Sequence, residues 1–130
     1  MKDIEQEVRH YLTERKWDKL RPGDLAKSVA IEAGELLELF QWDNPTLEEV
    51  KANPEKLAAI KKELADVLIY CLDMSVLLEL DTAAVIREKL EYVRRKYPPE
   101  LFQAREEGQD AGTEDAYWKI KKEYRQKGDV

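Results

Sequence analysis

The sequence is poor in the residues that several common catalytic sites require. It has one cysteine, Cys71, and one histidine, His10, in 130 residues. A disulfide within the chain is therefore excluded, and so is a zinc site built from several histidine and cysteine ligands. The two serines, Ser28 and Ser75, do not lie in the sequence of a nucleophile elbow, so a serine hydrolase is not expected. The single thiol is typical of a reducing compartment, and we expect a cytoplasmic protein.

Turn-forming residues and long apolar runs are also scarce. Five glycines and five prolines are too few for an all-β chain. The most apolar stretch, 64–80, contains three acids. Each would cost about 2.5–3.5 kcal/mol at the centre of a bilayer, so we expect no membrane partner. A net charge of -6 argues against a nucleic acid polymer as the main partner.

What remains is a chain suited to amphipathic helices. Charged residues make up 38% of the sequence and hydrophobic residues 43%, which is typical of a helical domain rather than of a disordered chain. Apolar spacings of three and four, together with capping residues such as Asp24, Thr46 and Asp81 or Thr82, mark the elements. The predicted helices are 3–17, 25–41, a short one after Thr46, 55–79, 82–96 and 114–126. We expect an all-α fold, with a four-helix bundle over 1–99 and a C-terminal tail over 100–130.

Two pairs of acids share a helix face because each pair is three residues apart. They are Glu32 with Glu35 and Glu63 with Asp66. This spacing is not enriched in a chain with 28 acids, so the surroundings must decide. Asp66 lies in a helix that is apolar on every side, and a buried carboxylate must be paired, neutralised or bound to a metal. Two alternatives stay open: a solvated face for the first pair, and a salt bridge from Asp66 to one of the arginines at positions 87, 94 and 95.

The chain length between the two pairs allows them to face each other. The 27 residues between Glu35 and Glu63 suffice for a loop and an antiparallel return. Four carboxylates without histidine form an all-oxygen site, which favours Mg²⁺ first, Mn²⁺ next, and Ca²⁺ as a further option. A di-iron oxidoreductase needs two Glu-x-x-His strings, whereas this chain has one, from Glu7 to His10.

Two strings in these helices resemble the motif helices of the MazG-like nucleotide pyrophosphohydrolases. They are IEAGELLELFQW, from Ile31 to Trp42, and KELADVLIY, from Lys62 to Tyr70. The resemblance runs over 17–98 and is closest to the branch that includes dCTP pyrophosphatases. It implies a MazG-like helical bundle and Mg²⁺-dependent hydrolysis of a nucleoside triphosphate to the monophosphate and pyrophosphate, as nucleotide-pool house-cleaning. It further implies a homodimer or a dimer of dimers, with Mg²⁺ held by Glu32, Glu35, Glu63 and Asp66.

The same resemblance implies three substrate-binding residues. Tyr70 matches the family's tyrosine after the second motif, Lys89 its lysine in the fourth helix, and Arg95 the first residue of its Arg-x-Tyr-Pro ending. Two departures bear on the substrate. Val93 stands where the dCTPase-like branch has asparagine, and the stretch 20–24 is one residue shorter. The preferred base and sugar are therefore left open.

Three further residues are candidates on chemical grounds. Glu38 lies one turn beyond Glu35 and can take a proton from an attacking water, or it is a plain surface acid. Trp17 and Trp42 each end a predicted helix and can stack on a base, with Trp42 favoured, although tryptophan more often packs in a core. The rival function is a non-enzymatic helical dimerisation or adaptor module whose acids form salt bridges between chains.

Overall fold

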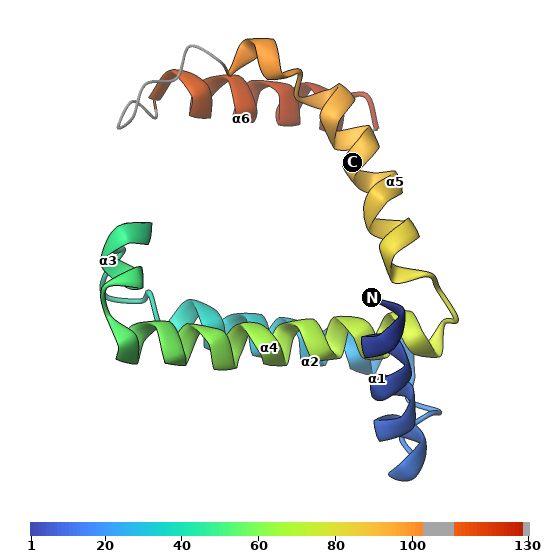
Figure 1. Ribbon diagram of the computed structural model, residues 1–130. Helices are drawn as coiled ribbons and strands as arrows, with labels where there is room; N and C mark the ends of the chain where they lie inside the picture. Colours follow the sequence, from blue (N-terminus) through green and yellow to red (C-terminus); the bar gives the residue numbers. More distant parts are fainter. Residues whose placement is uncertain (103–110, 129–130) are drawn as a thin grey trace. The chain divides into compact units, whose positions relative to one another are not determined.

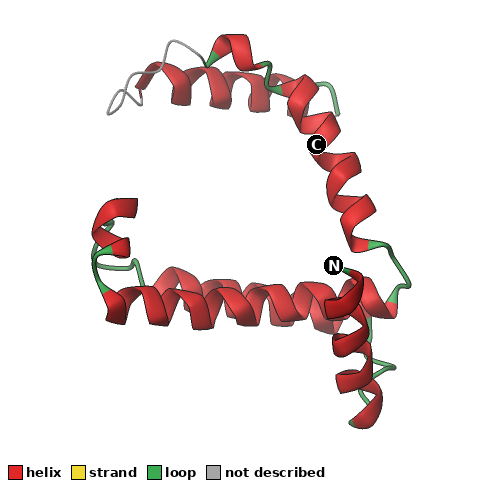
Figure 2. Ribbon diagram, in the orientation of Figure 1, coloured by secondary structure: helices red, strands yellow, loops and turns green. Residues whose placement is uncertain are grey.

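Every regular element that the structure describes is a helix (Figures 1 and 2). The computed structural model describes residues 1–102 and 111–128, without the side chains of 111–115. Over these residues the all-α prediction is confirmed, and none of the helices has the length and apolar character needed to cross a membrane. The elements are α1 (Lys2–Glu14), α2 (Pro22–Glu38), α3 (Leu47–Lys51), α4 (Pro54–Leu77), α5 (Thr82–Lys96), the 3₁₀ turn η1 (Pro99–Leu101) and α6 (Ala111–Gln126).

Side-chain caps explain where two of these helices, α3 and α4, begin. The Thr46 hydroxyl accepts a hydrogen bond from the Glu49 amide at 3.2 Å, as the sequence predicts for the start of α3. The Asn53 side chain caps α4 in the same way, by accepting from the Lys56 amide at 3.1 Å. Asp24, in contrast, is not the cap that the sequence predicts.

Helix α2 starts earlier because Pro22 occupies its first turn and Arg21 is its N-cap. Proline has a fixed φ suited to that position and lacks the N–H that would be unpaired there. Asp24 consequently lies inside the first turn, where its charge favours the helix dipole. Helix α6 also begins earlier than predicted, at Ala111 rather than residue 114.

The chain divides into two compact units, Met1–Ala83 and Ala84–Val130. The predicted division at residue 99 stays a prediction, and 103–110 and 129–130 of the predicted tail lie outside the described residues. In the first unit α4 contacts α1, α2 and α3, and α2 and α4 lie side by side and antiparallel (Figure 1). The core forms where Val8 and Leu12 of α1 pack on Val76 of α4.

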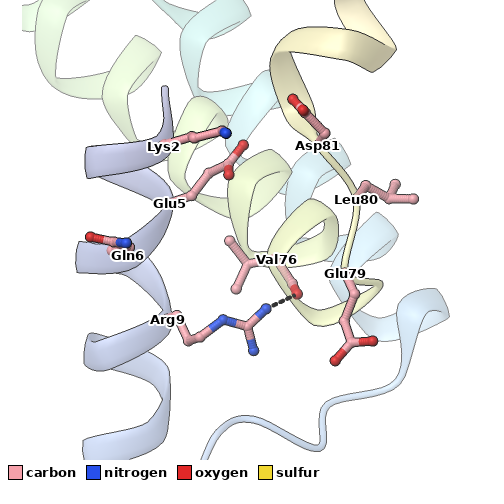
Figure 3. Close-up of a pocket in the computed structure, with 8 residues that line it drawn as sticks. All are labelled: Lys2, Glu5, Gln6, Arg9, Val76, Glu79, Leu80 and Asp81. Carbon is pink, nitrogen blue, oxygen red and sulfur yellow. Dashed lines mark hydrogen bonds between the residues drawn. The ribbon is translucent and has the colours of Figure 1, made fainter.

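Polar contacts fix α1 against the end of α4 (Figure 3). The Arg9 guanidinium donates to the Val76 carbonyl at 2.7 Å, and the Glu5 carboxylate accepts from the Thr82 amide at 3.0 Å. Both backbone groups lie at helix ends: the Val76 carbonyl also accepts from the Glu79 amide at 3.0 Å, and the Thr82 amide begins a helix, where a partner within the helix is lacking. A cavity of about 450 Å³ lies beside these contacts, between α1 and the turn after α4. The contacts hold α1 in place as one wall of the larger cavity described below.

Aromatic rings of the second unit pack on one another. Tyr97 and Tyr117 stack with ring centroids 5.0 Å apart, and Tyr92 meets Tyr124 edge to face at 6.3 Å. Lys96 is buried among these rings, with its ammonium 4.9 Å from the Tyr124 ring centroid and 5.4 Å from that of Tyr97.

Candidate functional site

The structure brings the two acidic pairs together between α2 and α4. One carboxylate oxygen from each of Glu32, Glu35, Glu63 and Asp66 lies within 4.8 Å of the others. The acids converge because α2 and α4 run antiparallel. The step from Glu32 forward to Glu35 on α2 therefore lies beside the step from Asp66 back to Glu63 on α4. Four oxygens at such separations suit the coordination of a hard divalent cation.

The electrostatics of this cluster are unfavourable without a cation. Oε2 of Glu32 and Oε2 of Glu63 are buried and have no hydrogen-bond partner among the described residues. A hydrogen bond shared with Glu32, and then the charge of Glu32, raise the pKa of Glu35. Burial, followed by the charges of Glu35 and Asp66, raises the pKa of Glu63. Raised pKa values of this origin mean that the like charges are crowded and are not balanced by cations of the cluster's own surroundings.

A cavity of about 850 Å³ extends from this cluster along α2 and α4 to α1. The walls follow helix faces, since the lining positions on each helix recur three or four residues apart. No lining residue is a lysine, an arginine or a histidine. The lining residues are Ile4, Glu7, Val8, Tyr11 and Leu12 of α1, Trp17 and Leu20 of the following loop, Asp24, Leu25, Ser28, Glu32 and Glu35 of α2, and Asp66, Ile69, Tyr70, Leu72 and Asp73 of α4.

Two of the predicted substrate-binding residues line this cavity. Tyr70 lies one turn beyond Asp66 on the same face of α4, and Trp17 lies near the α1 end, where its ring meets Tyr11 edge to face at 5.9 Å. Trp42 does not line the cavity and is 90% exposed, so it does not pack in a core either.

The other predicted residues lie outside the cavity lining. Glu38 is the last residue of α2 and is exposed, and its charge contributes to the raised pKa of Glu35. Lys89 and Arg95 lie on α5 in the second unit. Their predicted contacts with phosphate stay predictions.

Asp73 is a cavity residue that the predicted site did not include. It is only 4% exposed, and its Oδ1 has no hydrogen-bond partner among the described residues. Burial raises the pKa of its carboxyl. A signal for it was present in the sequence, because Asp66 and Asp73 fall on the same side of an otherwise apolar helix and flank Tyr70. Ser28 and Tyr11 line the cavity too, and nothing in their sequence surroundings marks them.

Comparisons with known proteins show which proteins this chain is similar to. A family model described as MazG-like matches residues 27–110. The protein "dCTP pyrophosphatase 1" of Mus musculus is 34% identical over 103 residues and that of Homo sapiens 32%, each match covering 78% of this chain. The chain spans 61% of the length of these relatives. A crystal structure of a pyrophosphatase from Archaeoglobus fulgidus matches with a TM-score of 0.66 and 35% identity, over 75% of this chain and 92% of that one.

Proposed function

Because the chain belongs to the MazG-like family, we propose that it hydrolyses a nucleoside or deoxynucleoside triphosphate to the monophosphate and pyrophosphate. One water is consumed, and the bond that breaks is the anhydride between the α- and β-phosphates. The observation that carries the proposal is the cluster of four carboxylates at one end of an 850 Å³ cavity. The role would be to remove unwanted nucleotides from the cellular pool.

The acidic cluster fits a divalent cation, and Mg²⁺ is our first choice, with Mn²⁺ as the second. Glu32, Glu35, Glu63 and Asp66 offer only oxygen ligands, and two of their oxygens are buried without a partner. When bound, such a cation neutralises phosphate charge and lowers the pKa of a water. The cavity lining supplies no positive charge of its own, so a triphosphate depends on cations from elsewhere.

The remaining residues are given roles that match their positions. Glu38, one turn beyond Glu35 at the end of α2, accepts the proton of the attacking water. Tyr70 borders the phosphate and sugar region next to Asp66, and Trp17 offers an aromatic surface for the base at the other end of the cavity. Lys89 and Arg95 bind phosphate oxygens. Trp42 is kept as the second candidate for stacking, although it lies outside the cavity lining.

The test is a panel of nucleoside triphosphates incubated with Mg²⁺, with Mn²⁺ or with EDTA. We expect the monophosphate and pyrophosphate as the first products of at least one deoxynucleoside triphosphate, and no turnover in EDTA. Glu35→Gln should abolish this turnover, whereas Glu55→Gln, at an exposed position in the first turn of α4, should not change it. Orthophosphate as the first product would contradict the proposal. No turnover under any condition would favour the adaptor module.

The family resemblance also implies a homodimer or a dimer of dimers. Light scattering on the eluting peak of a size-exclusion column measures the molar mass directly. A mass equal to the 15.2 kDa of one chain would contradict this part of the proposal.

A further inference from the structure

Asp73 is a buried acid that the proposed reaction leaves without a role. Its side chain lines the 850 Å³ cavity, is 4% exposed and has an Oδ1 without a partner among the described residues. Buried polar atoms in folded proteins nearly always have a hydrogen-bond partner. Among the residues that the structure shows lining this cavity, none is a lysine, an arginine or a histidine, so the lining itself offers Asp73 no ion pair. A ligand in the cavity could supply the hydrogen-bond donor that the lining does not.

The position of Asp73 along α4 indicates which part of a nucleotide it meets. Asp66, Tyr70 and Asp73 line the same cavity at spacings of four and three residues. At a rise of 1.5 Å per residue, Asp73 lies about 10 Å beyond Asp66 along the helix axis. In a nucleotide whose phosphates lie at the acidic cluster, the sugar comes next and the outer edge of the base is farthest away. Tyr70 then lies beside the sugar, and Asp73 faces the edge of the base.

The chemistry of a carboxyl group decides which bases fit. An ionised aspartate carboxylate only accepts hydrogen bonds, and an amino group that donates to it favours this ionised form. Cytosine and adenine present an amino group on the relevant edge, whereas uracil, thymine and guanine present a carbonyl at the corresponding position. A carbonyl facing the Asp73 carboxylate would put two acceptors together and leave a buried polar atom without a partner. Resting on the proposed function, we propose that Asp73 accepts a hydrogen bond from the exocyclic amino group of the base and so selects cytosine and adenine over uracil and thymine.

The experiment compares kcat/KM for dCTP and dUTP, which have the same ring size. We expect the parent protein to prefer dCTP by roughly 10- to 100-fold, the range for a hydrogen bond to a charged or buried acceptor. Asp73→Asn should bring the ratio close to one, since an amide can both donate to a carbonyl and accept from an amino group. The ratio within one variant does not depend on the folded fraction. Asp73→Ala is a second variant that should also reduce it, and Asp3→Asn, an exposed acid on α1, should leave it unchanged.

Other outcomes overturn the inference in distinguishable ways. One such outcome is that Asp73→Asn leaves the ratio of kcat/KM for dCTP and dUTP unaltered while both are hydrolysed. The proposed function then stands and the proposed role of Asp73 is wrong. The same result is expected if only water contacts this side chain. If the variant instead changes the ratio of dCTP to 2′,3′-dideoxycytidine triphosphate, Asp73 contacts the sugar and not the base.

A binding arm separates the inference from the reaction. If no triphosphate is hydrolysed, the thermal shift produced by dCMP is compared with that produced by dUMP. A larger shift with dCMP that Asp73→Asn removes would support the role of Asp73 although the proposed reaction fails. No shift with either nucleotide would overturn both.

Discussion

The buried lysine of the second unit has partners within its own unit, whereas buried acids of the first unit have oxygens without a partner among the described residues. In the second unit, the ammonium of Lys96 lies 4.9 Å and 5.4 Å from the ring centroids of Tyr124 and Tyr97, in a side chain that is 8% exposed. In the first unit, Asp73 is 4% exposed and its Oδ1 has no partner among the described residues. Oε2 of Glu32 and Oε2 of Glu63, in the acidic cluster, are also buried without a hydrogen-bond partner among the described residues.

The difference distinguishes a structural charge from a charge suited to binding. The face of an aromatic ring attracts a cation, so the chain itself supplies what Lys96 requires. The acids of the first unit lie near one another instead, and the pKa values of Glu35, Glu63 and Asp73 are all raised. Such groups gain from a cation or a hydrogen-bond donor that comes from outside the chain. The following predictions test this contrast from the largest expected effect to the smallest.

The largest effect is expected from Asp66→Asn, which removes one acid of the cluster and keeps its shape. We expect kcat/KM to fall by at least about 100-fold, because metal sites lose affinity and activity steeply when their ligands or supporting groups change. In EDTA the variant should be as stable as the parent or more so, since crowded like charges are relieved. Mg²⁺ should raise the melting temperature of the parent by mass action and that of the variant much less. The measurements are steady-state kinetics and thermal melts.

A salt bridge at Asp66 predicts the opposite result in EDTA. Removing one partner of a buried ion pair typically costs about 3–5 kcal/mol. A large loss of stability in Asp66→Asn, without any response of the parent to Mg²⁺, would mean that the four acids are not a metal site.

The aromatic residues of the two units provide the second test. The rings of Tyr97 and Tyr117 stack on each other in the second unit, whereas Trp17 lines a cavity of the first unit and is 46% exposed. If Trp17 stacks on the base, Trp17→Ala should raise KM by a factor worth about 1–3 kcal/mol, with little change in the affinity for pyrophosphate. Equal losses for nucleotide and pyrophosphate would mean that Trp17 is structural.

Trp42→Ala measured in the same assay tests the prediction from sequence. An increase in KM as large as that of Trp17→Ala would show that Trp42 reaches the substrate from its exposed position. An unchanged KM would assign the stacking to Trp17 alone.

The third test replaces the buried cation of the second unit. Lys96→Met keeps a long flexible side chain among the rings and removes the charge. We expect it to lower the free energy of unfolding by about 1–2 kcal/mol, the scale of a desolvated contact between a cation and aromatic rings. Urea denaturation measures this, with Lys119→Met on the exposed face of α6 as the control. No loss of stability would mean that the rings tolerate the ammonium without stabilising it.

Local signals in the sequence predicted the helices well and the site in part. Thr46 caps its helix as expected, because a cap depends on the chain within one turn. The convergence of Glu35 and Glu63 was predictable from helix faces and loop length. The long-range contacts were not: the pairing of Arg9 with the Val76 carbonyl and the burial of Asp73 both depend on where α1 packs. No spacing within a single helix encodes that packing.

The smallest effect is expected from the pH dependence of Asp73→Asn in EDTA. Burial raises the pKa of the Asp73 carboxyl above its ordinary value of 3.8, so the folded protein binds this proton more tightly than the unfolded chain does. Below pH 3.8 the carboxyl is neutral in both states. As the pH rises past that value the unfolded chain loses its proton first, and the parent loses stability until the folded group has ionised as well. Asparagine does not titrate, so the stability of the variant relative to the parent should increase through this window and then level off. Urea denaturation at intervals from about pH 3 to about pH 7 measures the difference. A difference that changes in the opposite direction would mean that ionised Asp73 has a cationic partner in the folded chain, as Lys96 has its rings, and the contrast between the two units would fail at this residue.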